Sequence, residues 1–463
     1  MQPEIVQQIK EILGAEYVLD KLEDRYCYTY DASSLSPGRR ALPGLVVFPA
    51  TADEISRILK LANQHRFAVI PRGAASNVSG GTIPCADAVV MVLTRMNRIL
   101  QIDARNMVAE AEPGVITADF QAAVERQGLF YPPDPASLAF CTLGGNVAEN
   151  AGGPRCAKYG VTRDYVLSLE VVLPTGEIIR TGAKTIKNVA GYDLTALMIG
   201  SEGTLGVVTK IAVKLRPLPR AKKTMLVIFD DLYRASETVA QVFIAGIIPT
   251  TLELLDKIYI RSIEEYVHMG LPVEAEAVLL IEVDGDDADL LDRQTASISR
   301  ICLQQGAVKV DVAMNAQEAE QLWLARRASF AAVARMRPTL IGTDITVLRD
   351  VIPEMIKRVR QISAKYNLVV PVLAHAGDGN LHPAILTDER DTEEMERAER
   401  ALDELFRATI ELGGTITGEH GIGQLHRRHL PWQIGDNGIM AMRAIKRALD
   451  PNNILNPGLR FGD

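Results

Sequence analysis

The stretch Phe67-Ala-Val-Ile-Pro-Arg-Gly-Ala-Ala-Ser-Asn-Val-Ser-Gly-Gly81 joins a short apolar strand to a loop of small residues. Residues 45–48 form an earlier apolar strand, and the helix after it begins at Thr51, with Glu54 completing a capping box. A strand, a helix and a second strand predict an α/β unit that ends in the loop 71–81. Because glycine and serine expose the backbone amides of this loop, it suits an anion, above all a pyrophosphate.

This loop differs from the two common phosphate-binding motifs. It lacks the Gly-Lys-Ser/Thr ending of a Walker A loop and the Gly-x-Gly-x-x-Gly fingerprint of dinucleotide-binding folds. A second stretch poor in regular structure, residues 132–153, contains Cys141-Thr-Leu-Gly-Gly-Asn146 and Asn150-Ala-Gly-Gly153. Loops this long inside a compact domain are usually functional, so the two stretches together favour a phosphate-bearing ligand over ordinary turns.

The composition is that of a soluble globular protein. The chain has 463 residues, 47% hydrophobic and 23% charged, which is enough for two or three domains. A formal net charge of -8 and the lack of a basic block argue against nucleic acid as a partner. The N-terminus predicts an amphipathic helix, and we expect neither a signal peptide nor a membrane span. Five scattered cysteines without a CxxC pair argue against a disulfide framework or an iron–sulfur cluster in this chain, and favour the cytoplasm.

The pattern of elements changes near residue 220, after Pro217 and Pro219. Before that point, residues 168–173 and 177–180 predict a hairpin, and residues 207–215 predict a strand. After it come two strand–helix–strand units, the first over residues 224–229, 232–245 and 251–255, and the second over residues 277–283, 298–304 and 308–312. Two such units predict a split-βαβ, ferredoxin-like sheet. Helices are expected over residues 316–335, 352–366, 393–412 and 439–449.

Three of the seven histidines fall in His375-Ala-Gly-Asp-Gly-Asn-Leu-His382 and Gly418-Glu-His-Gly421. Strands over residues 368–374 and 381–386, joined by a turn at 377–380, would place His375 directly opposite His382. Cross-strand Cβ atoms lie roughly 4.5–5.5 Å apart, so both imidazoles could bind one metal. Glu419 could add a carboxylate, while His420, pointing the other way in an extended segment, would remain a base. The alternative is that these histidines only hydrogen-bond a turn.

Six ordered motifs resemble the FAD-linked 2-hydroxyacid dehydrogenases of the vanillyl-alcohol oxidase superfamily, the group of D-lactate dehydrogenase, the glycolate oxidase flavin subunit and D-2-hydroxyglutarate dehydrogenase. They are Pro71-Arg-Gly-Ala with Ser79-Gly-Gly81, Gly144-Gly-Asn with Asn150-Ala-Gly-Gly153, Ile199-Gly-Ser-Glu-Gly-Thr-Leu-Gly-Val-Val-Thr209, the hairpin 375–382, Gly418-Glu-His-Gly-Ile-Gly423 and Asn456-Pro-Gly458. The resemblance implies an α+β fold. Residues 1–220 would form a FAD-binding domain of two α/β subdomains, residues 221–415 a ferredoxin-like substrate-binding cap with the metal hairpin, and residues 416–463 a helical segment that returns to the flavin.

The resemblance also implies the residues that line the cofactor. These are Pro71, Arg72, Gly73, Ala74, Ala75, Ser76, Asn77, Ser79, Gly80, Pro133, Asp134, Ser137, Gly144, Gly145, Asn146, Ala151, Gly152, Gly153, Glu202, Gly206, Val207 and Asn380. The alternatives are a solvent-facing charge for Arg72 and turn geometry for Asn146 and Asn380. Ala75-Ser76 stands where the family often has Gly-Thr or Gly-His, so no histidine anchors a covalent flavin in this loop and we expect noncovalent FAD.

The chemistry that the resemblance implies is oxidation of a D-2-hydroxy acid to the 2-oxo acid by hydride transfer to FAD. His375, His382 and Glu419 would hold a divalent metal, which could be zinc, manganese or iron, and His420 would accept the hydroxyl proton. Arg326, in Trp323-Leu-Ala-Arg326-Arg327, would clamp the substrate carboxylate. For Arg326 a surface ion pair with an acid such as Glu320 is the alternative, and Arg327 is expected to be solvated.

The sequence narrows the identity of the substrate and of the electron acceptor to a few candidates each. Thr343 stands where D-2-hydroxyglutarate enzymes carry a lysine, which favours D-lactate or glycolate over D-2-hydroxyglutarate. The acceptor would be an electron-transfer flavoprotein, an iron–sulfur subunit or a quinone. A homodimer or a larger complex fits a cytoplasmic protein, as does attachment to the inner membrane through a partner. The alternatives are an oxidase or other alcohol substrate, a noncatalytic FAD-binding subunit of a glycolate oxidase, and a colourless structural protein.

Overall fold

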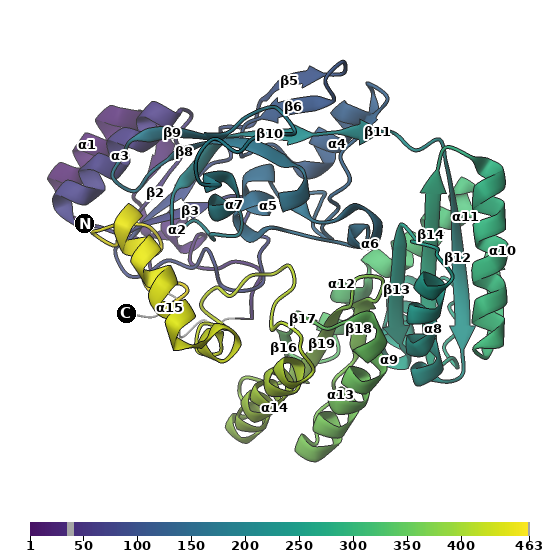
Figure 1. Cartoon of the computed structure of the whole chain (residues 1–463). Helices are drawn as coiled ribbons and strands as arrows, with labels where there is room; N and C mark the ends of the chain where they lie inside the picture. The colour runs from purple at the N-terminus through teal and green to yellow at the C-terminus, as the bar shows by residue number, and fades with distance from the viewer. Residues whose placement is uncertain (35–40, 462–463) are drawn as a thin grey trace. The chain divides into compact units, whose positions relative to one another are not determined.

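The computed structural model describes residues 1–34 and 41–461, and it divides into two compact units (Figure 1). Unit 1 consists of Met1–Ala151, Val161–Leu218 and Glu419–Asp463, and unit 2 of Gly152–Gly160 and Pro219–Gly418. Each unit combines helices with sheets, which confirms the expected α+β class. In the part of the chain that the structure describes, no helix is both long and apolar enough to span a membrane.

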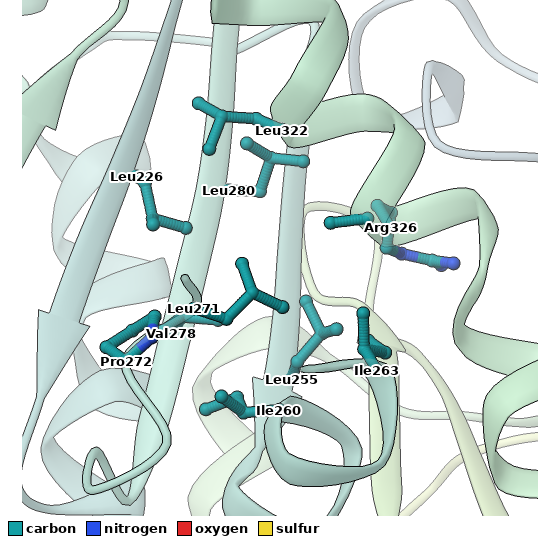
Figure 2. A pocket seen from close by; sticks show the side chains of 11 residues that line it. Leu226, Leu255, Ile260, Ile263, Leu271, Pro272, Val278, Leu280, Leu322 and Arg326 are labelled. Atoms are coloured by element: carbon teal, nitrogen blue, oxygen red, sulfur yellow. The ribbon is translucent and has the colours of Figure 1, made fainter. Parts of the chain in front are cut away.

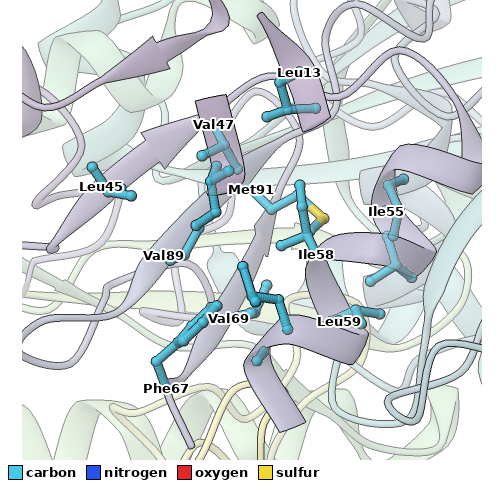
Figure 3. Packing of buried hydrophobic residues seen from close by; sticks show 14 of the residues in the cluster. Leu13, Leu45, Val47, Ile55, Ile58, Leu59, Phe67, Val69, Val89 and Met91 are labelled. Atoms are coloured by element: carbon cyan, nitrogen blue, oxygen red, sulfur yellow. The ribbon is translucent and has the colours of Figure 1, made fainter. Parts of the chain in front are cut away.

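The first sheet of unit 1 has the strand order β1-β2-β4-β3, formed by Val18–Leu19, Leu45–Val47, Val89–Val92 and Val69–Arg72. Strands β2, β4 and β3 are parallel, and helix α3 (Ala52–His65) connects β2 to β3. The predicted cap of α3 is confirmed, because the Thr51 hydroxyl accepts a hydrogen bond from the Glu54 N–H at 3.2 Å. Apolar residues of these strands and of α3 pack with helix α1 (Pro3–Leu13) in the core that Figure 3 shows.

The second sheet of unit 1 is antiparallel, with the order β5-β6-β10-β8-β9. Its strands are Ile99–Asp103, Val108–Ala111, Val207–Lys214, Val166–Val172 and Ile178–Gly182. The predicted hairpin is confirmed, since β8 and β9 pair from Val172 opposite Ile178 onward. Two further short strands of unit 1, β7 (Leu129–Phe130) and β11 (Arg216–Pro217), form a separate antiparallel pair.

The stretch 132–153 is not irregular throughout, because it contains helix α5 (Leu143–Glu149). Thr142 caps this helix by accepting a hydrogen bond from the Gly145 N–H at 3.2 Å. The prediction of a long loop was wrong here because two glycines in the first turn lower helix propensity. Close packing explains one of them, since a β-carbon at Gly144 would lie 2.5 Å from Cβ of Pro113. Among the described residues, unit 1 before its last segment also contains α2 (Leu22–Tyr26), α4 (Thr117–Glu125), α7 (Leu194–Met198) and the 3₁₀ turns Ala15–Tyr17 and Thr162–Asp164.

The last segment of the chain completes unit 1. Helix α15 (Leu430–Leu449) is longer than the predicted 439–449 and is kinked at Gly435, whose φ is 68°. After it, the Val69 N–H donates to the Ile454 carbonyl at 2.9 Å, and the Asn456 N–H donates to the Val69 carbonyl at 3.0 Å. The segment therefore pairs with β3, directly before the glycine-rich loop.

Unit 2 is built on an eight-stranded sheet of order β15-β12-β14-β13-β18-β19-β16, with β17 also paired to β19. The strands are Ala307–Val312, Ala221–Phe229, Ala277–Gly285, Thr251–Asp256, Val372–His375, Asn380–Thr387, Thr339–Gly342 and, for β17, Ile345–Thr346. The first four in this order are antiparallel neighbours, with α8 (Leu232–Ile244) and α10 (Ala288–Gln304) as their connections. This arrangement is the ferredoxin-like sheet that the repeat predicted.

The remaining helices of unit 2 differ from the prediction in two places. The single helix expected over residues 316–335 is wrong, because the chain breaks at Ala328 into α11 (Ala316–Arg327) and α12 (Ser329–Ala334). Helix α9 (Lys257–Val267) was not predicted. Helices α13 (Ile352–Tyr366) and α14 (Thr392–Glu411) pack side by side (Figure 1). Two short turns, α6 (Cys156–Tyr159) and the 3₁₀ turn Arg349–Val351, also belong to unit 2.

Candidate active site

The predicted hairpin of β18 and β19 exists, but its register differs from the expected one. His375 is the Cα partner of Asn380, and His382 is that of Leu373. The turn thus spans residues 376–379, and the two histidines are diagonal neighbours on one face, not direct opposites. Their ring centroids are nevertheless 5.1 Å apart. The turn is fixed at Gly379, where φ is +86° and a β-carbon would lie 1.9 Å from the Val347 carbonyl oxygen.

Asp344, which no sequence motif indicated, lies beside His382. Its Oδ1 is 3.7 Å from His382 Nδ1, and the side chain is buried between β16 and β17. The Asn380 amide donates to Oδ1 at 2.9 Å, and the Gly418 N–H donates to Oδ2 at 2.7 Å. Asn380 therefore holds a carboxylate next to the hairpin and is more than a turn residue. Strand pairings bring Asp344 here, of β19 with β16 and β17 and of Asp344 with Thr417, so spacing along the sequence contained no signal for it.

Both hairpin histidines have Nδ1 beside a protein oxygen. His375 Nδ1 lies 2.8 and 2.9 Å from the two carboxylate oxygens of Glu253, and His382 Nδ1 lies 3.3 Å from the Thr343 carbonyl. Burial raises the pKa of Glu253, but the charge of Arg326 and the hydrogen bonds from His375 and Arg326 outweigh burial and leave this pKa below its ordinary value. An ionised carboxylate and a carbonyl only accept hydrogen bonds, so Nδ1 donates in each neutral ring. The metal-binding lone pair is then on Nε2.

Arg326 is buried and faces a carboxylate of the protein. Its Nη2 lies 2.6 Å from Glu253 Oε2, and its Nη1 donates to the Ser329 hydroxyl at 3.2 Å. Figure 2 shows its aliphatic stem at an apolar pocket, with the guanidinium directed away from the leucines that line it. The surface ion pair with Glu320 was the wrong alternative for Arg326. That ion pair is formed by the neighbour, Arg327, which was expected only to be solvated.

Glu419 and His420 do not point in opposite directions, as an extended segment would require. The segment is bent, and His420 Nε2 lies 3.8 Å from Glu419 Oε1. Both side chains are partly buried. The prediction failed because the glycines on either side let the chain turn, so the alternation of a strand does not apply.

Two glutamates of unit 1, Glu202 and Glu149, lie against the residues after His420. Glu202 accepts hydrogen bonds from the N–H groups of Ile422 at 3.0 Å and Gly423 at 2.8 Å. A β-carbon at Gly421 would lie 2.3 Å from Glu149 Oε2. Burial raises the pKa of Glu149 well above its ordinary range, and the negative charge of Glu202 raises it further. The segment that carries His420 is thus fixed through its backbone.

The described residues offer one group of side chains with metal-ligating chemistry, Asp344, His382, Glu419 and His420. Two carboxylates and two imidazoles suit zinc, manganese or iron. Glu419 directly follows Gly418, whose N–H donates to Asp344 Oδ2 at 2.7 Å. His375 is outside this group, although its ring lies against that of His382.

The glycine-rich loop after β3 presents its backbone as a cradle for an anion. Among the described residues, no backbone N–H from Gly73 to Ser79 donates a hydrogen bond to a backbone carbonyl. The loop is fixed by Asp31, which accepts a hydrogen bond from the side-chain amide of Asn77 at 2.9 Å. A β-carbon at Gly73 would lie 2.4 Å from the Thr142 hydroxyl, so the loop packs on the first turn of α5. Amides in consecutive residues beside a helix start fit a pyrophosphate.

The other residues expected at the cofactor are spread over both units. Arg72 is buried, not solvent-facing, and donates to the Tyr30 carbonyl at 2.8 Å. Asn146 lies within α5 and donates to Thr117 Oγ1 at 2.8 Å, so the turn interpretation of Asn146 is wrong. The remaining expected residues lie as follows. Strand β3 ends with Pro71 and Arg72, and the loop after it contains Ala74, Ala75, Ser76 and Gly80. The first turn of α5 contains Gly144 and Gly145, and the residues on either side of this helix include Pro133, Asp134, Ser137 and Ala151; Gly206 and Val207 lie at the start of β10, and Gly152 and Gly153 belong to unit 2.

Comparison with known proteins gives the family. Residues 218–459 match the model "FAD linked oxidases, C-terminal domain", and residues 43–182 match "FAD binding domain". Glycolate oxidase subunit GlcD of Bacillus subtilis is 48% identical over 99% of this chain and 97% of its own. D-lactate dehydrogenase of Anaerostipes hadrus is 36% identical over 98% of this chain and 97% of its own.

Solved structures show the same fold at low identity. p-Cresol methylhydroxylase is similar with a TM-score of 0.82, at 19% identity over 99% of this chain and 96% of that one. 4-Ethylphenol oxidase from Gulosibacter chungangensis is similar with a TM-score of 0.81, at 20% identity over 99% of this chain and 96% of that one. The fold is that of the vanillyl-alcohol oxidase type.

Proposed function

We propose, because this chain belongs to the FAD-linked oxidases and is an FAD-linked oxidoreductase, that it oxidises a D-2-hydroxy acid to the corresponding 2-oxo acid. The observation that carries the proposal is the group Asp344, His382, Glu419 and His420, which suits a divalent cation able to bind the oxygens of a 2-hydroxy acid. The relatives named for glycolate and D-lactate support this substrate class. Bound FAD supplies the two-electron acceptor.

The proposed metal ligands are His375, His382 and Glu419, with Asp344 as a further oxygen donor that the structure adds. A divalent cation at these donors would lower the pKa of the substrate hydroxyl. The Nδ1 contacts of both histidines support the proposal, because a neutral ring that donates from Nδ1 carries its lone pair on Nε2. Zinc, manganese and iron all accept this donor set, so direct metal analysis identifies the ion.

His420 is the proposed base. Its backbone neighbours are fixed by Glu202, and its ring is partly exposed, as a group that must reach a substrate requires. The substrate would lose its hydroxyl proton to His420 and a hydride from its α-carbon. Since His420 is also a candidate ligand in the group around Asp344, the variant H420Q separates the roles: loss of rate with metal retained supports the base.

The cofactor is proposed to bind noncovalently through the loop 71–81 and the first turn of α5. The N–H groups from Gly73 to Ser79 would hold the pyrophosphate, and Asp31 keeps the loop in place through Asn77. Precipitation with acid, followed by the spectra of supernatant and pellet, tests this attachment, because noncovalent FAD remains in the supernatant.

A small monocarboxylate, D-lactate or glycolate, is the proposed substrate, with D-2-hydroxyglutarate as the alternative. Thr343 is buried and donates its hydroxyl to the Pro383 carbonyl at 2.7 Å, so it offers no charge to a second carboxylate. Arg326 is the proposed partner of the substrate carboxylate, although one edge of its guanidinium already binds Glu253. A substrate carboxylate would therefore contact only those N–H groups of Arg326 that do not bind Glu253.

The electrons are proposed to leave through a partner in the cytoplasm or at the inner membrane. Among residues 1–34 and 41–461, the group of metal-ligating side chains contains no cysteine, which supports an acceptor outside this chain. An electron-transfer flavoprotein, an iron–sulfur subunit and a quinone are the candidates. Reduced enzyme mixed with each acceptor without oxygen identifies the one that restores the flavin spectrum; the molecular mass in solution gives the oligomeric state.

The deciding experiment is the visible spectrum of the purified protein without oxygen during addition of D-lactate, glycolate, D-2-hydroxyglutarate or L-lactate. The proposal expects one D-acid or glycolate to bleach the flavin band rapidly. The variant H420Q should slow bleaching at least a hundredfold, while H268Q, a change at the exposed end of α9, should not. A metal-loaded yellow protein that no hydroxy acid bleaches would refute the proposal and favour a noncatalytic FAD-binding subunit.

A further inference from the structure

Glu253 lies at the centre of the unit 2 sheet, directly opposite His375. The two residues are Cα partners on the neighbouring strands β13 and β18. Glu253 has 0% of its surface exposed, and His375 has 4%. The pairing is therefore part of the sheet itself, and neither side chain can turn away without breaking a buried contact.

The carboxylate of Glu253 is bound on two sides by hydrogen-bond donors. His375 Nδ1 lies 2.8 Å from Oε1, and Arg326 Nε donates to Oε2 at 2.8 Å. Arg326 Nη2 approaches the same oxygen at 2.6 Å, which gives the buried carboxylate its counter-charge. A buried carboxylate held in this way stays in one orientation, because each alternative leaves a donor without its acceptor.

We propose that Glu253 is the positioning residue of the metal site, fixing the Nδ1–H tautomer of His375 so that Nε2 faces the metal. A carboxylate on the second ring nitrogen of a ligand histidine orients the ring and increases its basicity. Arg326 then serves this pair as well, because its guanidinium holds the carboxylate of Glu253 in place. The inference rests on the proposed function, since it assigns His375 to the metal.

The test is metal binding measured apart from catalysis. Metal-free wild type, E253Q and E253A, each with FAD bound, are titrated with Zn²⁺ against a chelator of known affinity. E253Q keeps an oxygen that can accept from Nδ1 but loses the charge, so its affinity should fall about tenfold. E253A removes the acceptor, and its affinity should fall about a hundredfold. Selective ¹⁵N-histidine spectra of the metal-free proteins should show the Nδ1–H tautomer of His375 in wild type and E253Q, and a tautomer mixture in E253A.

D256N is the matched control. Asp256 is on the same strand, is equally buried, and pairs with Arg360 at 2.7 Å without touching a histidine. The variant should lose stability but keep the Zn²⁺ affinity of wild type. If E253A does not fold, E253Q/R326Q removes both buried charges together and should fold with the weakened affinity.

The outcomes separate the two proposals. Wild-type affinity in E253A and E253Q/R326Q, or an unchanged His375 tautomer in E253A, overturns the role of Glu253. A wild type that binds no Zn²⁺, manganese or iron overturns the metal site of the proposed function instead. An equal loss of affinity in D256N would show a general effect of buried charge on the sheet and would also overturn the inference.

Discussion

Glu149 and Gly421 approach each other so closely that a β-carbon at residue 421 would lie 2.3 Å from Glu149 Oε2. Gly421 also has a φ of +81°, which side chains other than glycine rarely adopt. The contact joins helix α5 to the segment with Glu419 and His420. The position of His420 thus depends on its neighbour, residue 421, where only glycine fits.

The first prediction concerns this contact. G421A should lower the free energy of unfolding by about 2 kcal/mol or more, because it adds a clash to an unfavourable φ. It should also slow flavin bleaching by substrate, since the segment of His420 must shift. Chemical denaturation and stopped-flow spectra measure both effects. G128A is the control, because Gly128 has a φ of +72° with nothing within 4 Å, and its cost should stay near about 1 kcal/mol with an unchanged bleaching rate.

The second prediction concerns the pH dependence of stability. Burial and the charge of Glu202 raise the pKa of Glu149 well above its ordinary value of 4.5. The unfolded chain therefore releases this proton at lower pH than the folded protein, and stability is lost as pH rises from 4.5 through the raised pKa. E149Q cannot ionise, so its stability relative to wild type should increase over that window. A difference that stays constant from acid to neutral pH would contradict the prediction.

The third prediction concerns the glycine-rich loop. G73A should reduce the FAD retained after purification, because the new methyl group would collide with the Thr142 hydroxyl at 2.4 Å. T142A alone should cost about 1 kcal/mol of stability through the lost helix cap. The double variant G73A/T142A should regain flavin relative to G73A, since the collision is removed. Flavin absorbance per unit of protein measures each variant, and no recovery in the double variant would argue against the close packing of loop and helix.

The fourth prediction concerns Asp344. D344N should weaken metal binding about tenfold or more, because it removes a carboxylate beside His382. The Asn380 amide and the Gly418 N–H would also lose a charged acceptor. Metal analysis after dialysis measures the effect. D350N, an exposed aspartate in the 3₁₀ turn Arg349–Val351, should retain as much metal as wild type, and an equal loss in both variants would exclude a specific role for Asp344.

The sequence predicted elements whose signals are local. The Thr51 cap, the β8–β9 hairpin and helix α13 were recognisable because capping residues, alternation and helical spacing are encoded within a few residues. Helix α5 was not, because tertiary packing against Pro113 overrides the low helix propensity of its glycines.

The candidate site was only partly predictable for the same reason. His375 and His382 were recognised as a pair, but one residue in the turn decides the register, and Gly379 sets it through a contact with distant Val347. Asp344, between β16 and β17, and Glu253, on β13, became candidates only once these strands were placed in the sheet. A carboxylate without a motif gains its role from its neighbours in the sheet, which no local pattern records.

The pairing of β3 with residues 454–456 has a consequence for how the protein is made. Ile454 and Leu455 belong to the core of the first sheet, yet they are synthesised after all of unit 2. Unit 2 lies entirely before them in the sequence, so its sheet can form before the final segment of unit 1 has been synthesised. Nascent unit 1 thus has an incomplete edge beside its glycine-rich loop. The strand that leads into this loop therefore lacks its hydrogen bonds with Ile454 and Asn456 until residues 454–456 have been synthesised.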